Sequence, residues 1–305
     1  MKVLKLSGIS KKFRKKSAVT IGVFDGMHRG HLRLIKKTVE QACKTGGKAI
    51  LVTFDKHPEK HFKAGKKIKF IKDPEAKIKR AAALGIDIVT VLDFRKISGY
   101  SPEKFIEKIL VNKLNAGAVI AGSDFVFGKN AGGNKATLKK AGIKYGFKTI
   151  IVSDVRVKGK KVSSTAIRKA LKKGDIKIAE AMLGRKYAIT GKVIHGKHLG
   201  FAFPTANIRM SYEEIPAHGV WAVLVERKGK KYAGAANIGI APTLKKENRS
   251  MLEVYILGFK GRIYGEKLKV TFLQRIRPEK RFSSYKKLVD TVKKDIKMIR
   301  NKYRF

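Results

Sequence analysis

A glycine-rich segment with two histidines, residues 22–31 (GVFDGMHRGH), holds the residue types expected where a protein binds a phosphate chain. It begins within an apolar run at residues 17–24 and runs into a helical pattern. The three glycines let a polyanion approach the backbone, and the N-terminus of the following helix offers free N–H groups. His28 and His31 are three positions apart, so both imidazoles can face one phosphate chain and donate hydrogen bonds as charge develops. The segment therefore predicts phosphate-transfer chemistry.

A second group, Pro204-Thr205-Ala206-Asn207 together with the distant Glu253, could serve metal-assisted phosphoryl transfer. The Thr hydroxyl and the Asn carbonyl are hard neutral ligands, suited to Mg²⁺ that also holds nucleotide phosphates. A carboxylate on a strand can accept a proton from a hydroxyl that attacks a γ-phosphate. By themselves these residues fit an ordinary turn and an ordinary strand position better than a catalytic site.

A third segment, residues 162–168 (VSSTAIR), precedes a helical pattern. Arg168 is a permanent cation that can bind a phosphate with two parallel hydrogen bonds. Taken alone, the run Ser163-Ser164-Thr165 also fits a helix cap, so the segment by itself leaves both interpretations open.

The elements that must position these residues follow two patterns, which change near Gly184. In the first half, short apolar strands alternate with amphipathic helices, and this predicts a parallel sheet covered on both faces. The expected strands are 17–24, 48–54, 88–94, 118–121 and 148–152, and the expected helices are 31–44, 74–85, 101–114 and about 135–141.

In the second half, short strands are joined by turns, which predicts an antiparallel barrel. The expected strands are 187–195, 220–227, 232–238, 252–259 and 267–273. A helix from Ser283 closes the chain, and its apolar stripe and lysine-rich face are typical of a surface helix. We therefore expect two domains, residues 1–182 and residues 183–305.

Composition narrows the class of protein. The chain has 305 residues, 43% of them hydrophobic, which is enough for two domains and excludes general disorder. One cysteine allows neither an intramolecular disulfide nor a cysteine-based zinc site. No apolar stretch approaches 18 residues, and the basic N-terminus lacks the apolar block of a secretory signal. A cytoplasmic protein without a membrane partner fits best.

The formal net charge of +48 raises the alternative of a nucleic-acid-binding protein, because a basic surface attracts phosphate polymers. The lysines are nevertheless spread along the whole chain in short doublets, and no nucleic-acid-binding signature accompanies them. We therefore expect no specific nucleic-acid partner.

The first half resembles a known family. Residues 22–31 are similar to the GxFDGxHxGH signature of the HxGH nucleotidyltransferases, in particular their flavin adenylyltransferase branch. Three further segments resemble that branch in the same order: 53–58 (TFDKHP), 122–128 (GSDFVFG) and 162–168 (VSSTAIR). The resemblance implies a Rossmann-like domain with His28 and His31 as catalytic residues. It implies an ATP and phosphate site made of Gly22, Phe24, Asp25, Gly26, His28, His31, Ser164, Thr165 and Arg168, with Asp124, Phe125 and Phe127 near the flavin.

The second half resembles riboflavin kinase, which bacteria fuse behind the adenylyltransferase as one bifunctional flavin-synthesis enzyme. The matching pieces include 204–207 (PTAN), 219–223 (GVWAV), 237–239 (NIG), Pro242-Thr243, Glu253, Tyr264-Gly265, 277–279 (RPE) and Phe282. By this resemblance, Thr205 and Asn207 would hold magnesium, and Glu253 would be the general base for the ribityl 5′-hydroxyl. Gly196, Lys197, Gly200 and Pro204 would belong to the loop around the kinase ATP.

The resemblance spans about residues 14–300 and implies two reactions. The C-terminal domain would phosphorylate riboflavin with Mg-ATP, and the N-terminal domain would transfer AMP from ATP to FMN, giving FAD and pyrophosphate. The ligands would then be riboflavin, FMN, FAD, ATP and Mg²⁺, while the oligomeric state stays open.

One loop departs from the family pattern. The family has Gly-Arg-x-Leu-Gly-Phe directly before Pro-Thr-Ala-Asn, whereas residues 196–203 are GKHLGFAF. Lys197 can replace the arginine only as a point charge, and Ala241 stands where an arginine is common. Two alternatives therefore stay open: an FMN adenylyltransferase with an impaired kinase domain, and a basic nucleic-acid-binding regulator on the same scaffold.

Overall fold

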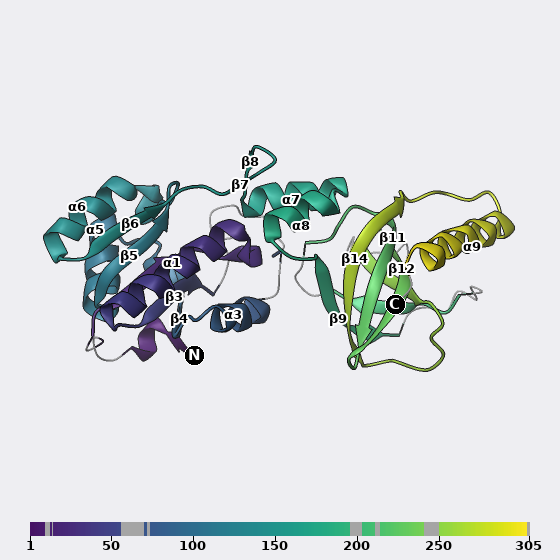
Figure 1. Cartoon of the computed structure of the whole chain (residues 1–305), viewed down its shortest axis with the longest axis horizontal. Helices are drawn as coiled ribbons and strands as arrows, with labels where there is room; N and C mark the ends of the chain where they lie inside the picture. Colours follow the sequence, from purple (N-terminus) through teal and green to yellow (C-terminus); the bar gives the residue numbers. More distant parts are fainter. Residues whose placement is uncertain are drawn as a thin grey trace. The chain divides into compact units, whose positions relative to one another are not determined.

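The computed structural model describes residues 1–9, 13, 15–55, 70–71, 74–195, 203–210, 214–240 and 250–303 (Figure 1). The chain divides into two compact units, Met1–Ser164 and Thr165–Phe305. This division falls at the first turn of helix α7 (Ser164–Lys173), whereas the predicted boundary between residues 182 and 183 follows helix α8 (Ile176–Leu183). The domain boundary stays a prediction.

The first unit contains a six-stranded sheet in the order β1-β4-β3-β2-β5-β6, and all of its strand pairs are parallel. The strands are β1 (Lys2–Lys5), β2 (Ser17–Ile21), β3 (Ala49–Phe54), β4 (Ile88–Leu92), β5 (Ala116–Gly122) and β6 (Lys148–Val152). The predicted parallel sheet is confirmed. The sequence analysis missed β1, which adds an edge to the five expected strands.

Helices cover both faces of this sheet, as its strand residues require. In β2, Ala18 packs with one core cluster and Val19 with the other, because successive side chains point to opposite faces. Helices α1 (Arg29–Thr45) and α3 (Pro74–Ala83) contribute to the first cluster. The second cluster includes residues of α5 (Pro102–Phe105), the π-helix η3 (Ile106–Lys113) and α6 (Lys135–Tyr145).

Short elements complete this unit. They are the 3₁₀ turns η1 (Leu6–Gly8), η2 (Asp25–Met27) and η4 (Lys129–Ala131), helix α4 (Phe94–Ile97), and the hairpin of β7 (Arg156–Val157) and β8 (Lys160–Lys161). From β2 the chain builds outward through β3 and β4, and then returns to the other side of β2 for β5 and β6. The strand order thus reverses between β2 and β5. In open α/β sheets, ligands bind beyond the carboxyl ends of the strands at such a point.

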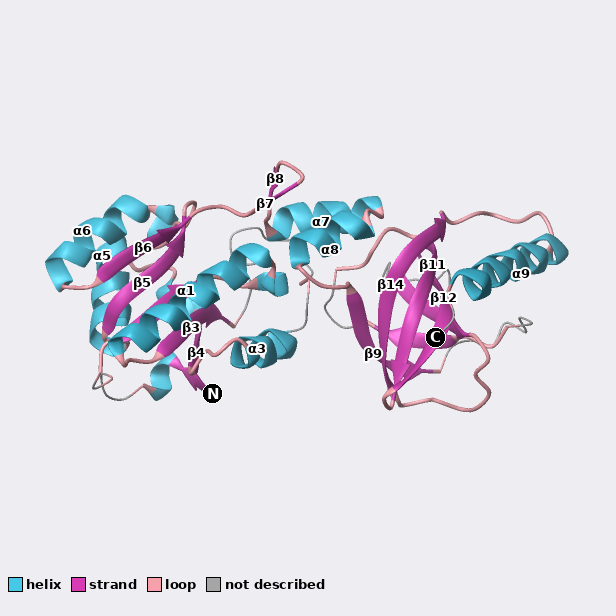
Figure 2. Cartoon of the chain, viewed as in Figure 1, coloured by secondary structure: helices cyan, strands magenta, loops and turns pink. Residues whose placement is uncertain are grey.

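The second unit contains a closed antiparallel barrel in the order β10-β13-β12-β11-β14-β9 (Figure 2). Its strands are β9 (Ala188–Ile194), β10 (Ala206–Arg209), β11 (Gly219–Arg227), β12 (Lys230–Ile240), β13 (Ser250–Ile256) and β14 (Lys267–Arg277), and helix α9 (Tyr285–Lys302) follows them. The barrel and its C-terminal helix are confirmed. Strand β10 was not among the expected strands, because its four residues overlap a motif that also fits a turn.

Side chains alternate between the interior and the exterior of the barrel, as the two-residue period of a strand requires. In β13, Leu252 and Val254 are fully buried and fill the interior together with Trp221 of β11. Glu253, which lies between the first two, therefore points to the outer face of the barrel, where it is half-buried. Among the described residues of both units, no helix is long and apolar enough to cross a membrane.

Candidate active sites

The corner between β2 and α1 is a tightly wound turn that brings the backbone to the carboxyl end of the sheet. Phe24 and Met27 adopt positive φ angles of 52° and 43°, and Gly26 has a φ of 76°. A Cβ on Gly26 would come within 3.0 Å of the Ile71 side chain, so this position requires glycine in both conformation and space. The backbone N–H of Ile71 donates to the Asp25 carboxylate at 2.9 Å, which holds the buried turn in place.

The two histidines of this corner lie against each other. Their ring centroids are 3.6 Å apart with an angle of 16° between the planes, so the imidazoles stack. His28 is the N-cap of α1, and its Nδ1 accepts a hydrogen bond from the backbone N–H of His31 at 3.3 Å. A Cβ on Gly30 would come 3.2 Å from the His28 ring, so the glycine leaves room for this arrangement. Both imidazoles thus lie at one helix N-terminus, while their role in binding phosphate stays a prediction.

His31 is held in its neutral form. Burial lowers the pKa of His31 well below its ordinary value, and the neighbouring charges of His28 and Lys77 lower it further. The Nδ1 atom of His31 is buried and has no hydrogen-bond partner among the described residues. A neutral imidazole can donate one hydrogen bond and accept another, so His31 suits an anionic ligand as a donor rather than as a cation.

A lysine that the sequence analysis missed lies at the same corner. Lys77 of α3 donates from Nζ to the backbone oxygen of Val23 at 3.1 Å and to Thr53 Oγ1 at 2.9 Å. Burial lowers its pKa to about 8, although the Asp25 carboxylate acts in the opposite direction. In a chain this rich in lysine, no local pattern distinguishes Lys77 from its neighbours. Only the packing of α3 against the strand ends identifies it.

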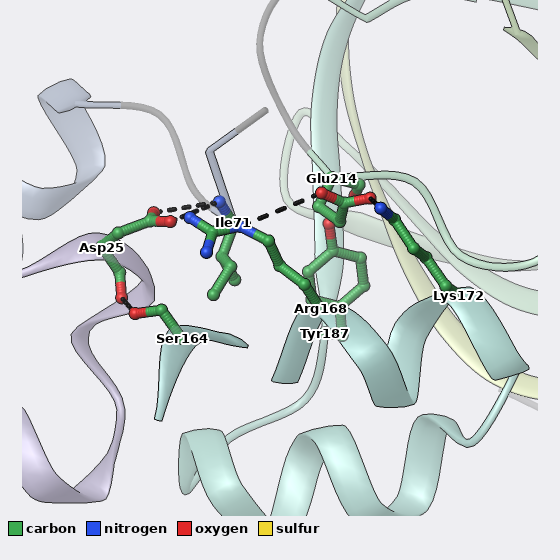
Figure 3. Close-up of polar contacts among 7 residues, drawn as sticks. All are labelled: Asp25, Ile71, Ser164, Arg168, Lys172, Tyr187 and Glu214. Carbon is green, nitrogen blue, oxygen red and sulfur yellow. Dashed lines mark hydrogen bonds and ion pairs between the residues drawn. The ribbon is translucent and has the colours of Figure 1, made fainter. Parts of the chain in front are cut away.

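The predicted phosphate residues of the 162–168 segment fall on both sides of the division between the units. Ser164 lies in the first unit, and its Oγ donates to the backbone oxygen of Asp25 at 3.0 Å (Figure 3). Thr165 and Arg168 lie in the second unit. Their place in the phosphate site stays a prediction.

Within the second unit, Arg168 is close to a buried carboxylate. Its Nε lies 3.9 Å from Glu214 Oε2, and Lys172 Nζ lies 3.8 Å from the other carboxylate oxygen (Figure 3). The Tyr187 hydroxyl donates to the backbone oxygen of Glu214. These contacts orient the arginine side chain, and no motif in the sequence pointed to Glu214.

The residues predicted to lie near the flavin follow β5, at the other side of the strand-order reversal. Asp124 is exposed, and its carboxylate pairs with Lys161 Nζ at 2.8 Å. Phe125 and Phe127 stack with their centroids 5.4 Å apart. Phe127 is buried against Phe105, so it supports the loop from the core, whereas Asp124 and half-buried Phe125 are accessible to a ligand.

In the second unit, strand register brings distant polar residues together. Glu253 of β13 lies opposite Asn207 of β10 on one side and opposite Asn237 of β12 on the other. Burial raises the pKa of Glu253, and a hydrogen bond with the Asn237 side chain acts in the opposite direction. The carboxylate is therefore flanked by two amides on the outer face of the barrel. The sequence motifs pointed to Glu253 and Asn207, but they gave no role to Asn237.

Glu253 opens into a cavity of about 290 Å³. Its lining comes from the barrel exterior, from the segment after β14 and from α9: Phe203, Thr205, Val220, Ala235, Ala236, Asn237, Glu253, Tyr255, Arg277, Glu279, Lys280, Phe282, Leu288, Val289, Val292 and Asp295. Arg277 Nε donates to the buried Asp295 carboxylate at 2.9 Å, which ties α9 to the end of β14. Helix α9 is therefore a wall of the cavity, a role that its amphipathic pattern did not reveal.

The oxygen ligands near Glu253 fit a magnesium ion that also binds phosphate. Exposed Thr205 directly precedes β10, and Asn207 is the register partner of the Glu253 carboxylate. Among the described residues, no group of three or more His, Cys, Asp or Glu side chains is placed to hold a metal. A hydroxyl oxygen and an amide oxygen are hard ligands that suit Mg²⁺, which keeps several waters and takes further ligands from substrate phosphates.

Three residues of the predicted kinase loop, Gly196, Lys197 and Gly200, lie outside the described residues. Ala241 and His57, which belongs to the 53–58 segment, also lie outside them. Pro204, the last predicted member of the loop, is exposed directly before Thr205.

Comparisons with known proteins agree with this geometry in both units. The FAD synthetase family matches residues 10–166, and the riboflavin kinase family matches residues 183–303. A protein of Buchnera aphidicola (subspecies Schizaphis graminum) named bifunctional riboflavin kinase/FMN adenylyltransferase is 38% identical over 95% of each chain. A protein of the same name from Escherichia coli K12 is 34% identical, covering 97% of this chain and 96% of its own. A crystal structure named macrolide-efflux protein, from Streptococcus pneumoniae, is 30% identical over 98% of each chain, with a TM-score of 0.84.

Proposed function

Since the chain belongs to the bifunctional riboflavin kinase/FMN adenylyltransferase family, we propose that the Glu253 cavity carries the kinase reaction and the histidine corner carries adenylyl transfer. The chain phosphorylates riboflavin to FMN and transfers AMP from ATP to FMN, giving FAD and pyrophosphate. The observation that supports the placement most directly is the register of Glu253 with Asn207 and Asn237 at a ligand-sized cavity.

In the kinase reaction, the riboflavin ring lies in the cavity between the barrel exterior and α9, with its ribityl 5′-hydroxyl at Glu253. The carboxylate accepts the hydroxyl proton while the hydroxyl oxygen bonds to the γ-phosphorus of ATP and the bond to the leaving ADP breaks. Burial favours protonation of Glu253, and the Asn237 side chain supports the ionised form that a base requires.

Thr205 and Asn207 would hold Mg²⁺ beside Glu253. A bound magnesium ion would neutralise charge on the nucleotide phosphates. Thr205 contributes a hydroxyl oxygen and Asn207 an amide oxygen, while Glu253 remains available as the base.

In adenylyl transfer, the chain needs no nucleophile of its own, because a phosphate oxygen of FMN attacks the α-phosphorus of ATP. The bond between the α-phosphorus and the bridging oxygen breaks, and pyrophosphate leaves with the electron pair. His28 and His31 donate hydrogen bonds to the phosphates, and the N-terminus of α1 adds its dipole and free N–H groups. Gly22, Phe24, Asp25, Gly26 and Ser164 shape the surrounding backbone, while Asp124 and Phe125 would meet the flavin.

The partners are small molecules: riboflavin, FMN, FAD and ATP. A cytoplasmic location belongs to the same proposal. It is supported by the single cysteine, Cys43, which is free and exposed and therefore suited to a reducing compartment.

The test is a chromatographic assay of purified protein with Mg-ATP, started once from riboflavin and once from FMN. The proposal expects FMN and FAD from the first substrate and FAD from the second. FAD from FMN alone would favour an impaired kinase domain. Failure with both substrates, together with salt-sensitive binding of polynucleotides, would favour the regulatory scaffold.

A further inference from the structure

Lys77 occupies an unusual position for a lysine side chain. It extends from α3 to the carboxyl ends of β2 and β3, where ligands of parallel sheets bind, and it is only partly exposed. To the described residues, its ammonium group donates two hydrogen bonds, to Val23 O and Thr53 Oγ1, and an ammonium can donate three. Within the described part of the chain, one N–H therefore remains for a ligand.

The electrostatics of the corner indicate that Lys77 supplies its positive charge. His31 is held neutral, and the ammonium of Lys77 is itself one of the causes. When a triphosphate binds at this corner, Lys77 rather than the neutral His31 would therefore supply the positive charge. Burial of the ammonium is costly, and Asp25 compensates only in part, so its pKa falls to about 8. A neutral side chain could make the two hydrogen bonds to Val23 O and Thr53 Oγ1 without the free-energy cost of burying a charge.

We infer that Lys77 contacts the phosphates of ATP in the adenylyl-transfer site and stabilises the pyrophosphate as it leaves. This inference rests on the proposed placement of adenylyl transfer at the histidine corner. It adds to that placement a cation that stabilises the negative charge developing on pyrophosphate as the bond at the α-phosphorus breaks.

The inference predicts a specific pH dependence. The groups that face Lys77 are the Asp25 carboxylate from η2, which favours the charged ammonium, the Thr53 hydroxyl from β3, which accepts its hydrogen bond, and the His31 imidazole from α1, whose own pKa Lys77 lowers. The active form is the ammonium, so FAD formation should fall as the pH rises through about 8. The phosphates of ATP and FMN are fully ionised in this range and do not add to the change.

The experiment measures FAD formation from FMN and Mg-ATP for wild type, Lys77→Met, Lys77→Arg and Lys79→Met. Lys79 is a matched control, because it is exposed on the same helix. We expect Lys77→Met to lower kcat/KM for ATP at least about tenfold, as for the loss of a hydrogen bond to a charged group. Lys77→Arg should keep most of the activity and lose the alkaline fall, because a guanidinium stays protonated. Lys79→Met should match wild type.

The riboflavin kinase activity of the same preparations reports whether each variant is folded. An unchanged kcat/KM in Lys77→Met, or no fall in the wild-type value between about pH 7.5 and 9.5, would overturn the inference. An equal loss of kcat/KM in Lys77→Met and Lys77→Arg, together with a lower Tm in both, would also overturn it. That pattern would indicate that Lys77 stabilises the fold and does not contact ATP.

His28→Asn separates this inference from the proposal beneath it. If His28→Asn leaves FAD formation intact, the placement of the reaction at the corner fails. If His28→Asn abolishes FAD formation and Lys77→Met does not, the placement stands and only the role of Lys77 fails.

Discussion

The two sites are built in opposite ways from the sequence. The proposed adenylyl-transfer site centres on one continuous segment, residues 22–31, where a strand passes into a helix. The proposed kinase site is assembled from β10, β12, β13 and α9, which are far apart in the chain. A local motif therefore describes the first site well, whereas the second depends on strand register, so its supporting residues emerge only in the fold.

Burial acts on both sites through one physical cause with opposite signs. It lowers the pKa values of His31 and Lys77, and it raises the pKa of Glu253, because in each case the charged form loses more solvation on burial than the neutral form. The first site is thereby poised to receive anions, which restore the charge of Lys77. In the second site, burial strengthens the tendency of Glu253 to accept a proton.

The largest expected effect separates the two sites at Glu253. Glu253→Gln should slow FMN formation by about 10²–10⁴-fold, because the amide cannot accept the hydroxyl proton. FAD formation from FMN should be unchanged, as measured by chromatography of both products. Glu226→Gln is the control, since this glutamate pairs with Lys269 on the barrel surface and should alter neither rate. Normal kinase turnover in Glu253→Gln would refute the assignment of the base.

The reciprocal change is at His28. His28→Asn should lower the rate of FAD formation by about 10²–10³-fold through loss of an imidazole donor, with FMN formation retained. Asparagine is a good N-cap, so the start of α1 is preserved and the effect reports chemistry rather than folding. A parallel loss of kinase activity would show that the two sites are not independent.

A smaller effect is expected at Asn237, which tests how the surroundings of Glu253 control its ionisation. Asn237→Ala removes the hydrogen bond that supports ionised Glu253, so the pKa of Glu253 should rise further. Protonated Glu253 cannot act as a base, so kinase activity should fall several-fold at the acidic end of the pH profile and much less at the alkaline end. The pH profile of kcat for FMN formation measures this. An equal loss at every pH would indicate that Asn237 only shapes the cavity.

The smallest effect concerns stability. The pKa of Lys77 is about 8 in the folded chain and 10.5 ordinarily, so the unfolded chain binds more protons between these pH values. Wild type should therefore gain up to about 3 kcal/mol relative to Lys77→Met as the pH rises from 8 to 10.5. Urea unfolding of both proteins at several pH values measures the difference. A difference that stays constant with pH would mean that Lys77 titrates normally in the folded protein.

The sequence predicted the fold class and most strands, because hydrophobic periodicity is strong in buried elements such as β3 and β5. It missed β1 and β10, whose four residues are too few to show a period. Among the candidate site residues, the motifs singled out both histidines and Glu253, whose roles stay predictions. They could not find Lys77, Asn237 or the cavity wall on α9, because each acts through packing with residues distant in sequence.

The edge strands of the parallel sheet affect how readily the protein associates with itself. The barrel closes on itself, so each of its strands has two neighbours, while the parallel sheet ends at β1 and β6. An edge strand can pair with a strand of another molecule and so begin aggregation. Exposed lysines lie at both ends of β1 (Lys2 and Lys5) and at the start of β6 (Lys148). Like charges would meet wherever two such edges approached each other, so part of the strongly basic composition protects the chain against self-association.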